Sequence, residues 1–257
     1  MLDNLSLVIF WSLVGGAFSL VGGIILLSNK RFAFKVTKLA VPFAGGALLG
    51  AVFLDLLKEA SHEGESEIAL TFCLVGIIAF FVLEKAIHWV HHHHSSEDDK
   101  RHKDAKIPLI VIGDTMHNFI DGLAIGAAFL VSPASGIVTS LVIATHEIPQ
   151  EIGDFGLLLS KGLSRKKTLL INVSSALAST LSAVLAFILG EKLNINTGAI
   201  IGLTAGFFIY IALSDVIPAI QKKESDKKQF IGSGTVMLIL GATTVGLMAE
   251  QIHKILQ

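Results

Sequence analysis

Cysteine and charged residues are scarce in this sequence, and each scarcity excludes a class of protein. Only 16% of the 257 residues are charged, against roughly 25% in an average soluble domain, while 52% are hydrophobic and the mean hydropathy is +0.70. The single cysteine, Cys73, excludes an intramolecular disulfide and a thiolate cluster that would hold a soft metal or an iron–sulfur centre. The composition therefore favours an integral membrane protein over a soluble one.

Long apolar runs account for most of the chain. They fall at about residues 5–27, 39–57, 68–90, 107–131, 135–160, 168–190, 197–220 and 232–252. Because a membrane-spanning helix needs about 20 residues, the chain has room for about eight spans and none for a separate soluble catalytic domain. We predict an all-α integral membrane protein in which residues 1–257 form a single transmembrane domain of eight helices.

Basic residues are distributed unevenly, although the net charge is only −1. All Lys and Arg residues except Lys58, Lys192 and Lys254 lie in the first, third, fifth and seventh connections between the apolar runs or, for Lys85, a few residues before the third connection. Since loops rich in Lys and Arg stay in the cytoplasm, this alternation predicts that both termini lie outside. It also supports eight as the number of spans, because a different number would break the alternation.

The third connection, residues 91–106, is a predicted cytoplasmic loop rich in histidine. Its histidines include His91, His92, His93 and His94, which acidic and basic residues follow. Such a composition cannot build a hydrophobic core, so we expect the loop to be disordered. The four histidines either collect metal ions weakly along the metal path or belong to a solvated linker, and the sequence leaves both interpretations open.

A short internal similarity links the second and seventh apolar runs. Gly46 and Asp55 have the same spacing as Gly206 and Asp215, and the two predicted helices run in opposite directions. An inverted repeat is the architecture of many secondary transporters. Two shared residues in glycine-rich helices can also coincide by chance, so both explanations remain open.

Acidic, imidazole and amide side chains interrupt the fourth and fifth apolar runs. In the fourth run they are Asp114, His117, Asn118 and Asp121. In the fifth run they are His146, Glu147, Gln150, Glu151 and Asp154. Spacings of three, four and seven residues place each set on one helix face. At a rise of about 1.5 Å per residue, His117 and His146 lie about 15 Å deep, near the middle of a hydrocarbon core about 30 Å thick.

Five of these residues are carboxylates, and neither apolar run contains a Lys or Arg that could neutralise them. An unpaired ionised carboxylate inside the membrane costs several kcal/mol. Protons can neutralise some of the five, but bound cations explain so acidic a cluster better. Imidazole, carboxylate and amide ligands suit a divalent ion such as Zn²⁺, Fe²⁺ or Mn²⁺, and the lack of thiolate and thioether ligands argues against Cu⁺. Asp114 and Asp154 lie toward the cytoplasmic ends, either as ligands on the metal path or as solvated side chains.

Two motifs in these runs resemble the signatures of a known family. Residues 117–126 read HNFIDGLAIG, and residues 146–155 read HEIPQEIGDF. They resemble the helix-four and helix-five signatures of the ZIP (Zrt/Irt-like protein) family of divalent metal transporters, the second being similar to the subfamily pattern HExPHExGDF. The resemblance implies an eight-helix bundle in a three-plus-two-plus-three inverted repeat. It also implies transport of zinc into the cytoplasm, with Fe²⁺, Mn²⁺ and Cd²⁺ as alternative ions.

The same resemblance implies a binuclear metal site. Its main part would consist of His117, Asp121, His146 and Glu151. Asn118 and Glu147 would line the second part, and Glu151 would bridge the two ions. Gln150 departs from the subfamily, which usually has a second histidine there, so metal preference and pH response are open.

The expected environment and partners follow from the same interpretation. We expect the divalent ion as substrate, the lipid bilayer as surroundings, no resident cofactor and no nucleic-acid partner. We expect a multi-pass protein of a cell membrane, with a prokaryotic cytoplasmic membrane favoured over an organelle membrane. A monomer and a homodimer both remain open.

An intramembrane zinc metalloprotease is the main alternative, because His146 and Glu147 open a HExxH-like motif. In that motif the second histidine binds the catalytic zinc, but Gln150 stands at its position. The alternative also leaves the five acids and the helix-four motif unexplained, so we do not expect an enzyme. A metal-responsive receptor is a third interpretation, which would bind metal without moving it.

Overall fold

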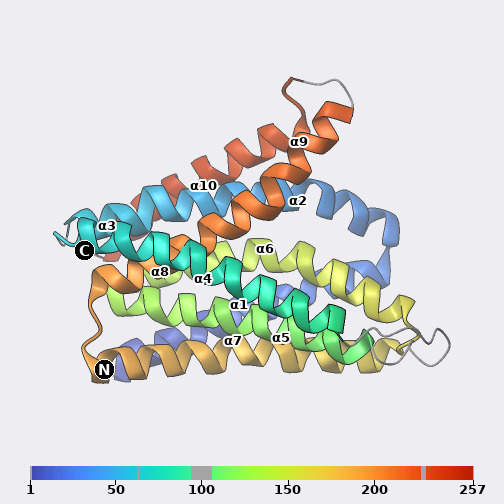
Figure 1. The fold of residues 1–257 in the computed structure, drawn as a ribbon, viewed down its shortest axis with the longest axis horizontal. Coiled ribbons are helices and arrows are strands. Elements are labelled where there is room, and N and C mark those ends of the chain that lie inside the picture. The colour runs from blue at the N-terminus through green and yellow to red at the C-terminus, as the bar shows by residue number, and fades with distance from the viewer. Residues whose placement is uncertain (1, 63, 94–105, 227–229, 257) are drawn as a thin grey trace.

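Helices make up nearly the whole protein in a computed structural model, which describes residues 2–62, 64–93, 106–226 and 230–256. No strand occurs among these residues. Figure 1 shows the long helices running side by side along the longest axis of the molecule, with the N- and C-termini at the same end. The predicted all-α class is confirmed.

The described residues form twelve helical elements. They are α1 (Leu2–Ser28), α2 (Lys30–Ala51), the π-helical segment η1 (Val52–Leu56), α3 (Leu57–His62), α4 (Ser66–His93), α5 (Lys106–Val131), α6 (Pro133–Ser160), α7 (Arg165–Leu193), α8 (Thr197–Ile211), the π-helical segment η2 (Ala212–Val216), α9 (Ile217–Asp226) and α10 (Ser233–Leu256). Because η1 joins α2 to α3 and η2 joins α8 to α9 without a break, the described chain forms eight continuous helical runs.

Six of these runs have the length and composition to cross a membrane. They are Asn4–Ser28, Arg31–His62, Ser66–Ala86, Arg165–Leu193, Thr197–Asp226 and Ser233–Leu256. The remaining long helices, α5 and α6, carry the acidic and imidazole residues that lower mean hydropathy. Large apolar side chains also face outward: Leu70, Leu170, Leu181 and Leu247 are each at least 60% exposed, as expected of helices that lipid covers. The protein is a multi-pass membrane protein, and the crossing of the membrane by all eight runs stays a prediction.

Local sequence explains where several helices begin. The side chains of Asn29, Ser132, Ser164 and Asn196 each accept a hydrogen bond from a backbone N–H in the first turn of the following helix, which is the usual role of these residue types at a helix N-terminus. At the other end of α7, Asn194 adopts a left-handed conformation with φ 48°, and the helix stops there.

The closest helix pairs are α5 with α7, α4 with α8, α2 with α10, and α1 with α6. Glycine permits such contacts where two backbones meet. A Cβ atom added to Gly122 of α5 would lie 1.9 Å from the carbonyl oxygen of Ser179 in α7. This close approach positions the face of α5 that carries the predicted ligands, because Asp121 immediately precedes Gly122.

The predicted His-rich loop begins within a helix. The backbone of α4 continues helically through His93, three residues into the range 91–106, since extending an existing helix by one residue is far easier than starting one. His94 and the rest of the predicted loop up to residue 105 lie outside the described residues, and so do the side chains of His91, His92 and His93.

Candidate metal centre

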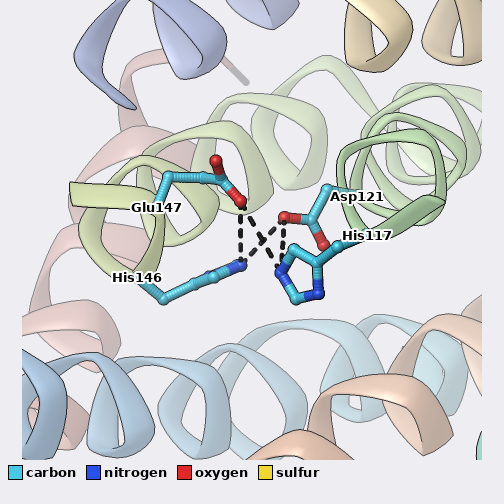
Figure 2. Close-up of side chains that lie close together, drawn as sticks. All are labelled: His117, Asp121, His146 and Glu147. Carbon is cyan, nitrogen blue, oxygen red and sulfur yellow. Dashed lines mark hydrogen bonds and ion pairs between the residues drawn. The ribbon is translucent and has the colours of Figure 1, made fainter. Parts of the chain in front are cut away.

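Helices α5 and α6 bring four potential metal ligands together. Figure 2 shows His117 and Asp121 of α5 pointing toward His146 and Glu147 of α6. One potential ligand atom from each residue lies within 4.8 Å of the others. Among the described residues, this is the group of three or more histidine, cysteine or acidic side chains whose ligand atoms all lie within 4.8 Å of one another.

The distances within this group are close to those of a coordination sphere. His146 Nε2 lies 2.8 Å from Asp121 Oδ2, and His117 Nε2 lies 3.6 Å from the same oxygen. Glu147 Oε1 lies 3.6 Å from His117 Nε2 and 3.8 Å from His146 Nε2. Ligands about 2.1 Å from a tetrahedral zinc ion are about 3.3 Å from one another, so small side-chain adjustments would suffice to hold one.

The sequence spacing explains how the ligands of each helix come to lie together, and the packing of α5 against α6 explains how the two helices share one group. His117 and Asp121 are four residues apart on α5, so they lie one above the other on the same helix face. His146 and Glu147 are adjacent on α6, and both reach the group because the two helices pack against each other. The two imidazole rings meet edge to face, with their centroids 5.6 Å apart.

Several polar atoms at this centre are buried and have no hydrogen-bond partner within the described part of the chain. They include both carboxylate oxygens of Glu147, both carboxylate oxygens of Glu151, and Nδ1 of His146. Glu147 is 2% exposed and Glu151 is 1% exposed. A buried charge without a partner is costly unless a counter-charge or a proton neutralises it. The residues present therefore fit a bound cation.

Asn118 lies next to the group and holds α5 to α7. Its Nδ2 donates to the backbone oxygen of Asp114 at 3.2 Å, to Asp114 Oδ1 at 3.1 Å and to Ser175 Oγ at 3.3 Å. Ser175 belongs to α7, so the amide bridges two helices. The amide N–H groups of Asn118 therefore take part in hydrogen bonds beside the cluster.

The other predicted site residues lie near the four-residue group without belonging to it. Glu151 and Asp114 are buried, whereas Gln150 and Asp154 are half-buried. The structure therefore groups Glu147, which the resemblance assigned to the second part of the site, with His117, Asp121 and His146 of the main part. Their roles as ligands stay predictions.

A polar stripe on α7 is the feature that sequence reasoning missed. Asn172, Ser175, Ser179 and Ser182 are buried, and both amide atoms of Asn172 have no hydrogen-bond partner among the described residues. The spacing of three, four and three residues is the signal that could have revealed it, because it places the four side chains on one helix face. This stripe contacts α5 beside the metal ligands through Ser175.

Comparison with known proteins gives a family model and several zinc transporters that match the chain. A family model described as "ZIP Zinc transporter" matches residues 5–109 and 93–249. The zinc transporter ZIP10 of Danio rerio is 39% identical over 144 residues, which cover 54% of this chain and 17% of that protein. The zinc transporter ZIP4 of Mus musculus is 41% identical over 143 residues, covering 51% and 21%.

The zinc transporter ZIP6 of Homo sapiens is 42% identical over 110 residues, which cover 43% of this chain and 15% of that protein. The chain thus spans less than a quarter of the length of each of these three relatives. The family model, by contrast, matches nearly the whole of this chain. The chain belongs to the ZIP zinc transporter family.

Proposed function

We propose that the protein transports a divalent metal ion, with zinc favoured, through the site between α5 and α6. The observation that carries this proposal is the group of His117, Asp121, His146 and Glu147, which joins two imidazoles and two buried carboxylates across two helices. This ligand set suits zinc, and equally iron, manganese or cadmium as alternative substrates. The zinc transporters that resemble the chain support zinc as the first choice.

A second ion position would lie one helical turn further along α6. Glu151 is four residues after Glu147 on the same face, is buried, and has two carboxylate oxygens without a hydrogen-bond partner. Asp114 and Asp154 are close enough to interact with Glu151 electrostatically. An ion held first by the four-residue group would therefore meet further carboxylates on its way out, which supports a binuclear site with Glu151 shared between two ions.

The proposed topology has eight spans with both termini outside, so that ions move toward the cytoplasm. The basic residues support this orientation, since those that the structure describes, apart from Lys58, Lys192 and Lys254, lie toward one end of the helices while the termini share the other end. Because α5 then runs outward and α6 inward, Asp114 and Asp154 lie on the cytoplasmic side of the four-residue group. They would form the exit of the path.

An inverted repeat is supported by the helix packing. In such a repeat α1, α2 and α4 correspond to α7, α8 and α10, and α5 corresponds to α6. This correspondence turns the pair α5–α7 into α6–α1 and the pair α4–α8 into α10–α2, and all four pairs are observed. The two π-helical segments agree with this correspondence, because Asp55 and Asp215 are each the fourth residue of their segment.

Close glycine contacts point to the same symmetry. A Cβ atom on Gly46 would lie 1.9 Å from the carbonyl oxygen of Leu238 in α10, and one on Gly206 would lie 2.3 Å from that of Cys73 in α4. Each glycine thus permits its helix to approach the third helix of the other half. We therefore propose the three-plus-two-plus-three arrangement, in which two related halves allow access from either side of the membrane.

The metalloprotease alternative has no such support in the described residues. Gln150 stands where the second zinc-binding histidine would be needed. Glu147, which would have to act as the general base, lies 3.6 Å from His117 and belongs to the ligand group itself. The family to which the chain belongs is a family of transporters.

Zinc flux into liposomes tests the proposal. The purified protein should carry zinc to an indicator trapped inside, and His117→Ala and Glu147→Gln should each reduce the flux at least about tenfold, since even outer partners of a metal ligand are worth 10- to 100-fold. Glu191→Gln is the matched control, because this exposed carboxylate lies at the end of α7. Equal flux from all folded variants would refute the proposed path, whereas binding without flux would favour a receptor.

A further inference from the structure

A second cluster of potential metal ligands lies far from the α5–α6 site in the fold, where the end of α2, α3 and the end of α10 meet. These segments surround a cavity of about 270 Å³. Five potential ligands line it, namely Asp55, Glu59, His62, Glu250 and His253. In the proposed topology this cavity faces the outside, at the end of the bundle where both termini lie.

Asp55 is the buried anchor of this cluster. Its side chain is 0% exposed, and its Oδ1 lies 2.8 Å from Nε2 of His253. Its second oxygen, Oδ2, is buried and has no hydrogen-bond partner in the described part of the chain. A buried carboxylate with one acceptor atom unused is costly unless something positive approaches it. Asp55 is among the residues that line the cavity, so a small rotation of its side chain would turn this oxygen toward a cation there.

The potential ligands come in pairs from two helical segments, and no three of their ligand atoms lie within 4.8 Å of one another in the structure. Asp55 and Glu59 are four residues apart, and Glu250 and His253 are three residues apart, so each pair lies on one face of its helix. A Glu-x-x-His pair of this kind, together with carboxylates from facing helices, is how helical bundles hold metal ions. Asp55 also lies in the π-helical segment η1, and such segments occur frequently at functional sites.

Two lysines compete with a cation at this place. Lys254 Nζ lies 2.6 Å from Glu250 Oε1, and Lys58 also lines the cavity. The side chains of Lys254 and Glu250 are 61% and 52% exposed, and an exposed ion pair of this kind contributes little. Glu250 can therefore turn from Lys254 toward an ion at small cost.

We propose that this cavity binds one divalent transition-metal ion through Asp55 and His253, and that the side chains of Glu59 and Glu250, which line the same cavity, move toward the ion when it binds. Separating Asp55 Oδ1 and His253 Nε2 from 2.8 Å to about 3.3 Å would admit a zinc ion between them. An ion bound there would join α10 to the α2–α3 segment. The two residues that meet at this contact, Asp55 and His253, are 198 positions apart in the sequence. The site is independent of the transport proposed for the α5–α6 centre.

Zinc binding by the full chain in lipid nanodiscs tests this site through the change that substitutions in the cavity make to that binding. The background variant carries His117→Ala with His146→Ala, so that the α5–α6 group cannot hold zinc in the same way. We expect this background to bind zinc in equilibrium dialysis, and Asp55→Asn with His253→Gln to weaken that binding at least about tenfold. Cobalt titration should show the matching loss of the absorption bands that report imidazole coordination.

Two exposed substitutions keep the test decisive if the buried variant does not fold. Lys254→Gln should tighten zinc binding several-fold because it releases Glu250, and Glu250→Gln should weaken it. Glu67→Gln is the matched control, since this exposed carboxylate lies at the start of α4 and outside the cavity. Zinc binding that is insensitive to changes at Asp55, His253, Glu250 and Lys254 would overturn the proposal. It would leave the transport proposal untouched, because flux is not measured.

Discussion

Gly122→Ala is the substitution that links helix packing to metal binding most directly. The new Cβ atom would lie 1.9 Å from Ser179 O, 2.0 Å from Ser182 Oγ and 2.6 Å from Ser179 C. Ordinary contact begins at 3.4 Å, and two of the three atoms are backbone, so α5 and α7 must separate by about 1.5 Å locally. The side-chain hydroxyl can rotate away, but the carbonyl group cannot.

The separation acts on the metal site because Asp121 is the neighbour of Gly122. Moving α5 by more than 1 Å changes the 2.8 Å contact between Asp121 Oδ2 and His146 Nε2. Overpacking of this kind lowers the free energy of unfolding by about 1–3 kcal/mol. The better helix propensity of alanine raises it by about 1 kcal/mol. We therefore expect unchanged or lowered thermal stability, together with zinc affinity reduced at least about tenfold, as for the loss of a partner that orients a ligand.

Gly153→Ala provides the matched control for this prediction. Gly153 lies on α6 near the same site, but a Cβ atom added there meets nothing within 4 Å. The control should be as stable as the parent or slightly more stable, with unchanged zinc affinity. Isothermal titration calorimetry and thermal unfolding in the same detergent measure both quantities. If Gly122→Ala binds zinc as tightly as Gly153→Ala, the close contact of α5 with α7 does not position Asp121, and the reasoning is wrong.

Three further predictions concern the ligands and the start of α10. Lowering the pH from about 7.5 to about 5.5 should weaken zinc binding at the α5–α6 centre, because protons compete for imidazole and carboxylate ligands; affinity that does not change with pH would contradict this. Gln150→His should add an imidazole one turn from His146 and raise the preference for zinc over manganese, which competitive uptake measures and which an unchanged preference would refute. Glu224→Ala should lower the melting temperature, since Glu224 accepts hydrogen bonds from Thr235 N at 2.8 Å and Thr235 Oγ1 at 2.6 Å at the start of α10. Asp226→Ala, at the exposed end of α9, is its control, and thermal unfolding should separate the two variants.

Much of the fold could be predicted from the sequence because membrane helices are determined locally. A helix satisfies its own backbone hydrogen bonds, so length and composition alone identify it. The apolar runs predicted from the sequence correspond in order to the helical runs in the structure. The boundary after α4 was harder to predict, because the helix continues into the histidine-rich segment as far as His93.

The candidate ligands were predictable for the same local reason. Residues three or four apart share a helix face, so His117 could be paired with Asp121 on one helix and Glu147 with Glu151 on the other. Which residues of α5 meet which residues of α6 depends on how two helices rotate and cross, and helix spacing does not contain that information. The grouping of Glu147 rather than Glu151 with His117 is visible only in the structure.

By itself, the sequence determined the membrane class, the helical runs, the distribution of basic residues, and the two polar faces with their acids and histidines. Only the tertiary structure decided the contacts between distant segments. It placed Asn118 on Ser175, Asp55 on His253, and Glu147 beside the two imidazoles. The physical reason is that residue order sets the periodicity of one helix, whereas the close backbone contacts at residues such as Gly122 set how helices fit together.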